Sequence, residues 1–186
     1  MCEENRTEDE ILIQNYLAGD AESFDELYAR YKKPLYAYLN RLLQDRALAD
    51  DLFQQTWIKV LNRLEKYESK KKFFAWLSMI AHNLAIDHFR RAKNNAELPL
   101  EEEAELPDRG GSNEPWRNLH NRELKKALER ATGALPGDLR EVFLLRQEGI
   151  SFKEIADIQK CTLNTVLGRM RYALLNLRKQ LQEWNS

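Results

Sequence analysis

The chain has 186 residues, and its 29 Lys and Arg residues against 30 Asp and Glu residues give a net charge of −1 at pH 7. This length suits one medium domain or two small ones, and so small a net charge argues against a histone-like protein that coats DNA by charge alone. The acidic start MCEENRTEDE lacks the features of a signal peptide, and no stretch reaches the roughly 18 apolar residues of a membrane span, so we expect a cytoplasmic protein without membrane insertion.

The first 93 residues predict four helices separated by short breaks. The chain contains few Gly and Pro residues and many Leu, Ala, Glu, Lys and Arg residues, a composition that favours an all-α fold. Apolar residues at helical spacing place the helices at 8–18, 21–43, 48–67 and 73–93, with Pro34 expected to kink the second helix or start a new one. In the third helix the expected inward positions are Leu52, Phe53, Trp57, Val60, Leu61 and Leu64. Together these helices suffice for a compact bundle, which we expect to be one domain, 1–93.

The fourth of these helices has two stripes. Its core stripe is Phe73, Leu77, Ile80 and Leu84. Trp76, Asn83 and Arg90 lie seven residues apart on a neighbouring stripe, and further cations flank the helix at Lys70, Lys71, Lys72 and Arg91. This combination suits single-stranded DNA, because cations follow phosphates, rings stack on bases and an amide pairs with a base edge. The alternatives are that Trp76 belongs to the core and that the cations are only solvated.

Residues 94–117, NNAELPLEEEAELPDRGGSNEPWR, differ in character from the helices on both sides. Three prolines, a Gly-Gly pair and an acidic run leave no helical period, which predicts a flexible acidic linker. A second small helical domain, 118–186, follows it. Its first helices are expected at about 118–131 and at 138–147.

Residues 151–181 predict a helix-turn-helix. Ser151 and Glu154 form a capping box for a short helix, and Thr162 can cap a second, longer one. The second helix has an expected inner stripe of Leu163, Val166, Met170, Leu174, Leu177 and Leu181. The residues expected to face away from it are Asn164, Thr165, Gly168, Arg169 and Tyr172, with Arg171 on the flank. Such a face suits a DNA major groove, whereas an αα-hairpin with a merely solvated face is the alternative.

Charge alternates along the chain. Residues 1–58 carry a net −6 and residues 59–93 a net +6, while 94–123 carry −5 and 124–186 carry +4. Two basic blocks separated by an acidic one favour two nucleic-acid contacts, with the acidic parts meeting another partner. Chance alternation of solvated helix faces is the other interpretation.

Enzymatic and metal-binding motifs are missing from the sequence. His82, His88 and His120 have no metal-binding spacing, Cys2 and Cys161 fit neither a disulfide framework nor a zinc motif, and no Gly-rich phosphate loop occurs. His82 and His88 are expected to be packing or surface residues. We expect no catalytic residue, no metal and no cofactor.

Four segments together resemble the bacterial sigma factors of RNA polymerase, and most closely their extracytoplasmic-function (ECF) group. They are FDELYARYKKPLYAYLNRLL, DRALADDLFQQTWIKVL, FFAWLSMIAHNLAIDHFRRAK and LPGDLREVFLLRQEGISFKEIADIQKCTLNTVLGRMRYALLNLR. The resemblance implies that 1–93 is region 2, that 118–186 is region 4, and that the protein is not an enzyme. It also implies as partners core RNA polymerase (the clamp of the largest subunit and the flap of the second), promoter DNA and an anti-sigma factor.

The resemblance assigns roles to residues of this sequence. The minus-ten element would be bound by Lys70, Lys71, Lys72, Trp76, Asn83, Arg90 and Arg91, with Asn83 at a pocket for a flipped base. The minus-thirty-five element would be bound by Thr162, Asn164, Thr165, Arg169, Arg171 and Tyr172. Core polymerase would be bound by Asp50, Asp51, Gln54, Gln55 and Trp57, with Trp57 nearer the core of the bundle.

Three positions depart from the family pattern. Lys160 stands in the turn where the family has Gly, and a left-handed backbone there would carry a steric cost. Leu167 and Gly168 occupy positions that are commonly basic or polar. The departures at Leu167 and Gly168 keep open an interaction module that no longer initiates transcription. A separate alternative is an autonomous helix-turn-helix repressor or activator whose N-terminal bundle senses a ligand or forms a dimer.

Overall fold

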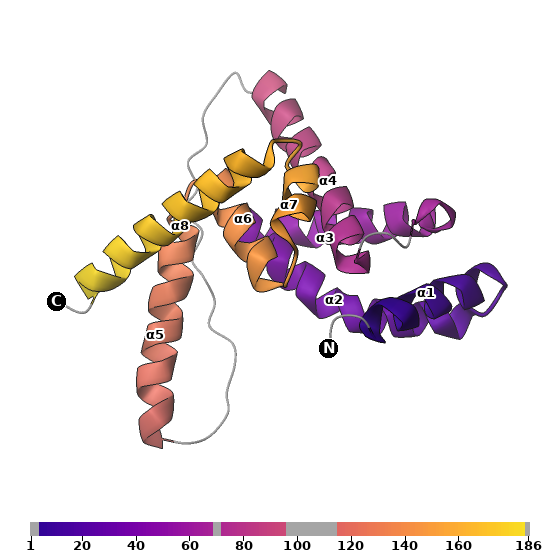
Figure 1. The fold of residues 1–186 in the computed structure, drawn as a ribbon, viewed down its shortest axis with the longest axis horizontal. Coiled ribbons are helices and arrows are strands. Elements are labelled where there is room, and N and C mark those ends of the chain that lie inside the picture. The colour runs from indigo at the N-terminus through magenta and orange to yellow at the C-terminus, as the bar shows by residue number, and fades with distance from the viewer. Residues whose placement is uncertain (1–3, 69–71, 96–114, 185–186) are drawn as a thin grey trace.

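Figure 1 shows a computed structural model of the chain, which describes residues 4–68, 72–95 and 115–184. The regular elements within these ranges are all helical, which confirms the predicted fold class. They are α1 (Glu4–Leu17), α2 (Ala21–Leu43), α3 (Arg46–Leu61), the 3-10 turn η1 (Leu64–Lys66), α4 (Phe73–Asn95), α5 (Pro115–Gly133), α6 (Gly137–Gln147), α7 (Phe152–Ile158) and α8 (Leu163–Trp184). No helix in the described part of the chain is both long and apolar enough to cross a membrane.

The ends of α2 and α3 follow from local chemistry. Asp20 caps α2, because its carboxylate accepts from the Glu22 amide at 3.1 Å and from the Ser23 hydroxyl at 2.6 Å. Gln44 ends α2 in the left-handed region, with φ of 56°. Asp45 then caps α3 by accepting from the Leu48 amide at 3.0 Å. A cap at each boundary fixes the short connections that let these helices pack antiparallel.

Two details of this part of the chain differ from the alternatives considered. α2 runs as one helix from Ala21 to Leu43, as expected, and no new helix starts at Pro34, since one missing amide donor does not outweigh the packing of the flanking turns. α3 ends at Leu61 and not at Tyr67, because the Arg63 amide bonds to the Val60 carbonyl in a tighter i to i−3 turn. This turn leaves Leu61 41% exposed and returns Leu64 to the core.

Aromatic rings fill the centre of the α1–α4 bundle. The Trp57 ring lies 4.8 Å from Tyr28, 5.9 Å from Phe24 and 6.4 Å from Phe53, and its side chain is buried. Edge-on ring pairs of this kind add to the free energy gained by burying apolar area. The predicted core stripe of α4, from Phe73 to Leu84, is buried as expected.

The first helix is attached to the bundle by a buried carboxylate. Asp9 of α1 is buried, accepts a hydrogen bond from the Tyr31 hydroxyl, and pairs with the Arg30 guanidinium at 2.6 Å. Burial raises the pKa of Asp9, although its bonds to Tyr31 and Arg30 oppose that rise. The Tyr31 ring also packs on the Phe73 ring, with 5.0 Å between the ring centroids. Contacts through α2 therefore link α1 to the start of α4.

The C-terminal helices form a second group. Ala131 of α5, Leu135, and Ala173 and Leu177 of α8 make a small buried cluster of their own. The other part of the group, α6 and α7, lies against α2 and α4 in the middle of the molecule (Figure 1). Buried residues of α6 and α7, including Val142, Leu145, Ile155 and Ile158, belong to the same core cluster as those of α2 and α4. The two groups of helices therefore share a continuous apolar interface.

The predicted inner stripe of α8 was partly wrong. Val166 and Leu177 are buried, but Leu163 is 47% exposed and Leu174 is 49% exposed. The helix is turned so that Ala173, which is too small to have been counted as a core position, faces its neighbours. Close approach of α5 and α6 to Ala173 selects this rotation, and the larger leucines are displaced toward solvent.

Candidate nucleic-acid interface

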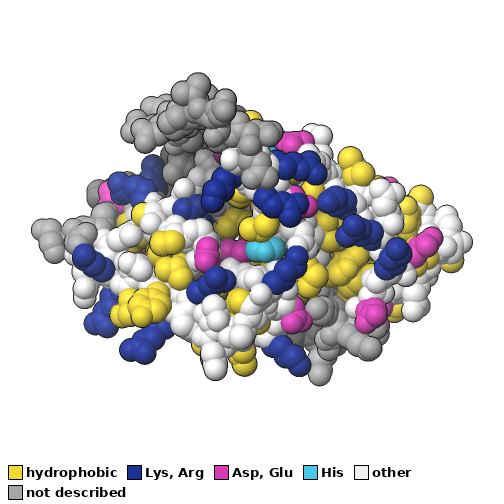
Figure 2. Space-filling view, turned by 90° about the horizontal axis from the view of Figure 1, so that it is seen from above, with side chains coloured by type: hydrophobic (Ala, Val, Ile, Leu, Met, Phe, Trp, Pro, Cys, Tyr) yellow, Lys and Arg dark blue, Asp and Glu magenta, His cyan; other side chains and the backbone are white. Residues whose placement is uncertain are grey.

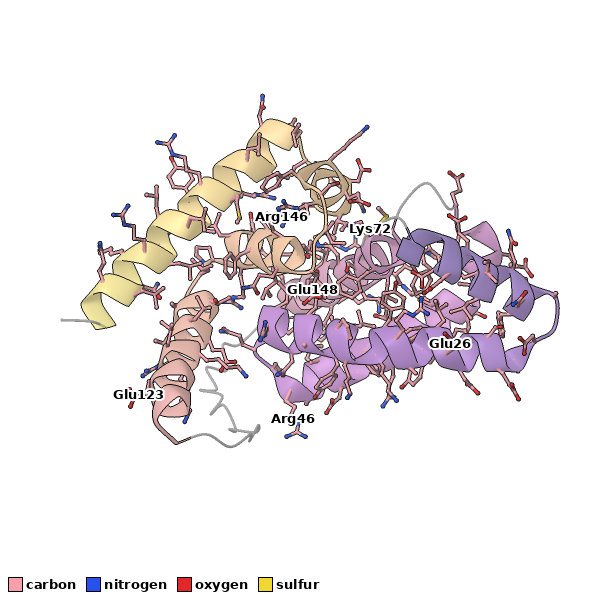
Figure 3. All side chains as sticks on the ribbon, turned by 60° about the horizontal axis from the view of Figure 1, so that its bottom comes forward. Glu26, Arg46, Lys72, Glu123, Arg146 and Glu148 are labelled. Carbon is pink, nitrogen blue, oxygen red and sulfur yellow. The ribbon has the colours of Figure 1, made fainter. Side chains whose placement is uncertain are left out.

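Cationic side chains gather on one face of the molecule. Figure 2 shows Lys and Arg there, around a smaller group of acidic and histidine side chains. On α4, Arg90 and Arg91 are exposed, and Arg90 donates to the Asp87 carboxylate at 3.1 Å. Lys72 precedes α4 and lies at the junction with the C-terminal helices (Figure 3), whereas Lys70 and Lys71 lie outside the described residues. The described cations at the two ends of α4 can follow a phosphate backbone.

Trp76 and Asn83 lie on the expected stripe of α4 but are in different environments. Trp76 is half-buried, with its ring 5.3 Å from Tyr67 and 5.7 Å from Phe73, so much of its surface is used in packing. Asn83 donates to the Met79 carbonyl at 2.7 Å and accepts from the Lys160 ammonium at 2.8 Å. The amide oxygen of Asn83 is therefore occupied by a residue of the helix-turn-helix.

The helix-turn-helix forms as predicted. The Ser151 hydroxyl accepts from the Glu154 amide at 3.2 Å, and the Glu154 carboxylate accepts from the Ser151 amide at 3.0 Å, which completes the capping box. The Thr162 hydroxyl accepts from the Thr165 amide at 3.2 Å and so caps α8. Between the helices Lys160 has a φ of 51°, so the predicted steric cost is present in the turn.

The outward face of α8 carries most of the predicted contact residues. Those that are exposed are Thr162, Asn164, Thr165, Arg171 and Tyr172. Arg169 differs from them, because its guanidinium pairs with Asp138 of α6 at 2.8 Å and donates to Gln159 at 2.7 Å. Arg169 thus ties α8 to α6 and α7 and is only partly available to a ligand.

Four of the five predicted protein-binding residues share one face of α3. Asp50, Asp51 and Gln54 are exposed, and Gln55 donates to Asp51 at 2.8 Å. A hydrogen bond to Asp50 is the main cause of a raised pKa at Tyr36 of α2, so this carboxylate is also oriented from a neighbouring helix. Trp57 lies among the buried rings, and its contribution to this surface is indirect.

Two apolar residues extend this face and were not predicted. Ile58 is 58% exposed and Leu61 is 41% exposed, and the helical period places both beside Gln54 and Asp51. Exposed apolar side chains bordered by polar ones are typical of a protein-protein interface. A helical projection of 46–61 alone carries this signal, but the sequence interpretation counted Leu61 as a core position.

Sequence reasoning also missed the group that joins the two halves. Glu141 of α6 is buried, and its carboxylate accepts from Tyr38 of α2 at 2.6 Å and lies 2.8 Å from Nδ1 of His82 of α4. Gln159, at the end of α7, donates to the second carboxylate oxygen of Glu141 at 2.8 Å.

Across the described residues, no group of three or more His, Cys, Asp and Glu side chains is arranged to hold a metal ion.

Two family models match the chain. The model described as Sigma-70 region 2 matches residues 27–95, and the model described as Sigma-70, region 4 matches residues 125–177. The first match contains α3 and the exposed part of α4, and the second contains the whole helix-turn-helix. Both candidate DNA surfaces and the α3 face therefore lie inside matched segments.

Several curated proteins are similar along nearly their whole length. The RNA polymerase sigma-H factor of Pseudomonas aeruginosa is 28% identical over 182 residues, which cover 94% of this chain and 94% of that protein. The ECF RNA polymerase sigma-E factor of Haemophilus influenzae is 29% identical over 183 residues, 94% of this chain and 95% of that protein. The sigma-E factor of Escherichia coli is 29% identical over 87% of this chain and 88% of its own.

Two solved structures share the fold. The sigma factor RpoE of Bartonella quintana, in complex with the anti-sigma factor NepR, has a TM-score of 0.70 at 23% identity and covers 87% of this chain and 98% of its own. CnrH, in complex with the cytosolic domain of CnrY, has a TM-score of 0.65 at 23% identity and covers 95% of this chain and 98% of its own. At these identities the likeness concerns the fold.

Proposed function

This chain is an extracytoplasmic-function sigma factor of the sigma-70 family, and we propose that it reads two promoter elements with α4 and α8 while α3 holds it on core RNA polymerase. A sigma factor binds core polymerase and directs initiation to specific promoters. Its own contribution is binding, and phosphoryl transfer belongs to the polymerase. The observation that carries the proposal is that a helix ending in exposed arginines, α4, and a capped helix-turn-helix lie within the two matched segments.

The minus-ten element is proposed to bind along α4. Arg90 and Arg91 would hold phosphates, and Asn83 would pair with the edge of a base flipped out of the strand. Trp76 would offer the part of its ring that packing leaves accessible, and Lys72 would contribute charge with Lys70 and Lys71. Support comes from the exposure of both arginines and from the Asn83 amide, whose oxygen already accepts from a cation.

The minus-thirty-five element is proposed to bind the outward face of α8. Thr162, Asn164 and Thr165 would lie at the start of the helix, where residues of a recognition helix meet base edges and phosphates. Arg171 and Tyr172 would continue the contact along the groove. Arg169 could contact a base only after its ion pair with Asp138 breaks. In the structure Arg169 therefore serves to position α8 against α6.

Core polymerase is proposed to bind the exposed face of α3, by analogy with the clamp contact of the family. Asp50, Asp51, Gln54 and Gln55 would meet basic groups, and Ile58 and Leu61 would supply buried apolar area. Trp57, which is packed among the buried rings of the bundle, would hold α3 in place. Region 4 would in turn meet the flap of the second-largest subunit.

An anti-sigma factor is proposed as a further partner. RpoE of Bartonella quintana and CnrH, which share this fold, were solved with NepR and with the cytosolic domain of CnrY. Because its DNA and polymerase partners are cytoplasmic in bacteria, the protein is proposed to act there.

Run-off transcription with purified core polymerase tests the proposal. The template should carry the promoter upstream of the protein's own gene, and a template with the minus-ten box scrambled is the control. We expect a discrete transcript only when this chain and the intact promoter are both present. A chain that binds core polymerase but yields no promoter-dependent transcript would match the interaction module instead.

A further inference from the structure

A glycine interrupts the recognition helix where a helix-forming residue would be more stable. Gly168 lies in the second turn of α8, well inside a helix that runs from Leu163 to Trp184. Glycine loses more backbone freedom on folding than alanine does, which lowers the folded-to-unfolded ratio about fivefold at an internal helix position. The chain therefore carries a stability cost at Gly168.

The rest of the described chain does not require a glycine at this position. The glycines that have a positive φ are Gly19 and Gly149, so the backbone of Gly168 is one that any residue can adopt. A Cβ atom added to Gly168 would meet no described atom within 4 Å. At Gly133, by contrast, an added Cβ would lie 2.3 Å from Nε2 of Gln44. A contact outside the chain is then the physical reason that is left for Gly168.

Gly168 is at the centre of the outward face of α8. The residues three and four positions away on either side share its face of the helix. They are Asn164, Thr165, Arg171 and Tyr172, which are all exposed and are all assigned above to the minus-thirty-five element. α8 itself lies at the edge of the molecule (Figure 1). The missing side chain therefore leaves a notch in the middle of the proposed reading surface.

Apolar side chains border this notch. Tyr172 and Leu175 lie on the same side of α8 as Gly168, and Leu167 lies at the edge of that face. All three are exposed, although the face is otherwise polar and cationic. The apolar group that a base pair presents in the major groove is the C5-methyl group of thymine. An apolar border around a notch matches that methyl group, and the exposed Arg171 suits a phosphate beside it.

We propose that Gly168 is a specificity-determining residue of the minus-thirty-five contact, because its missing Cβ lets α8 admit the 5-methyl group of one thymine. The proposal rests on the function proposed above for α8 and deepens it, since it names the base that this position reads. Asn164 and Thr165 lie one turn before the notch, where the first residues of a recognition helix meet base edges. An alanine at position 168 would place its own methyl group where the thymine methyl group lies.

The experiment combines one change in the protein with one change in the DNA. Holoenzymes are prepared with the wild-type chain, with Gly168→Ala and with Gly137→Ala. The last is the matched control, because a Cβ at Gly137, at the start of α6, also meets no described atom within 4 Å. The duplex is the promoter upstream of the protein's own gene, and each thymine of its minus-thirty-five box is replaced in turn by deoxyuridine, which lacks the 5-methyl group. Competition followed by fluorescence anisotropy gives each affinity.

We expect Gly168→Ala to change stability and DNA binding in opposite directions. Denaturant titration of the free chain should show the folded-to-unfolded ratio raised about fivefold. The same variant, as holoenzyme, should bind the natural duplex roughly tenfold more weakly. At one thymine, deoxyuridine should weaken wild-type binding about fourfold, because one buried methyl group is lost, and should tighten binding by Gly168→Ala. Gly137→Ala should bind every duplex as the wild type does.

Four results would overturn the proposal. The first is a Gly168→Ala chain that is less stable than the wild type, because the fold would then need the glycine. The second is unchanged binding of the natural duplex by this variant. The third is a loss that deoxyuridine reverses at no thymine, which would indicate a close phosphate instead of a methyl group. The fourth is weaker association with core polymerase at unchanged promoter selectivity, which would assign the notch to a protein partner.

The proposed function of α8 fails on a different measurement. A wild-type holoenzyme that binds intact and scrambled minus-thirty-five boxes equally would remove that function. A wild-type holoenzyme that distinguishes the two boxes, but whose Gly168→Ala form shows no reversal at any thymine, would keep the function and lose only the notch.

Discussion

The Lys160 ammonium lies 2.8 Å from the side-chain oxygen of Asn83, although the two residues are 77 positions apart in the chain. Lys160 holds a left-handed backbone in the turn of the helix-turn-helix, at φ of 51°. Lys160, whose strained backbone lies in region 4, therefore hydrogen-bonds the Asn83 amide of region 2 that is proposed to pair with a base.

Replacing Asn83 with Ala should impair promoter opening and leave polymerase association intact. The change removes the amide that pairs with the flipped base but does not touch the α3 face. Permanganate reactivity of the minus-ten thymines in the holoenzyme complex reports opening, and co-purification reports association. Equal loss of both would remove the base-reading role, with Arg91→Ala as the comparison for a phosphate contact.

Exchanging Asp51 for Lys, or Ile58 for Glu, should weaken binding to core polymerase. The first change reverses a charge that is proposed to meet basic groups, and the second buries a charge within the interface. Competition against a labelled sigma factor for core polymerase measures the effect, expected at about 1–3 kcal/mol for an interface position. Asp25→Lys, on an exposed part of α2, is the control, and an equal loss there would point to general charge effects.

Asp138→Ala should have a small effect on the stability of region 4, and Arg169→Ala a larger one, because Arg169 also donates to Gln159 at 2.7 Å. The 2.8 Å ion pair of Arg169 and Asp138 joins α8 to α6, and a pair with an exposed partner is worth about 0.2–1 kcal/mol. Denaturant titration of both single variants and the double variant gives the coupling. Loss of about 1–3 kcal/mol of sequence discrimination in Arg169→Ala alone would instead indicate that Arg169 reads a guanine after leaving Asp138.

The packing of region 4 against region 2 should weaken in acid. Burial opposes ionisation of Glu141, but its bonds with His82, Tyr38 and Gln159 outweigh burial and hold the pKa below its ordinary value of 4.5. A carboxyl whose pKa is lowered by this packing stabilises the packing fully above pH 4.5, and this contribution is lost as the pH falls through the lowered pKa.

The titratable groups that face Glu141 are Tyr38 and His82, one from each region 2 helix that contacts it. The distance between the two regions, followed by energy transfer from pH 6 down to the acid limit of folding, checks the expectation. Glu141→Gln should flatten the transition, because the titrating carboxyl is gone. A wild-type transition that this variant leaves unchanged would assign the effect to other carboxylates.

Local pattern predicted the helices and the capping of the helix-turn-helix well, because those features depend on neighbours in sequence. The stripe of α4 from Phe73 to Leu84 and the box of Ser151 and Glu154 are examples. The rotation of α8 was missed, since it depends on how closely α5 and α6 approach Ala173. Amphipathic period alone cannot separate two adjacent apolar stripes on one helix.

The burial of Glu141 was beyond sequence reasoning for a similar reason. Glu141 sits in an apolar run of α6, and its partner Tyr38 is 103 residues away, so nothing local shows that the carboxylate is buried. The exposed face of α3 could have been found from the sequence, but the assignment of Leu61 to the core concealed the apolar side chains at its C-terminal end. The roles given to the individual DNA-contact residues stay predictions.

Promoter binding measured with and without core polymerase tests the central claim most directly. Fluorescence anisotropy of a duplex carrying both promoter elements should show tight, sequence-dependent binding only when the chain and core polymerase are mixed. The free chain should bind that duplex weakly, and scrambling either element should reduce holoenzyme binding. Tight binding of the free chain to an inverted-repeat duplex, without association with core polymerase, would contradict the account and favour an autonomous repressor.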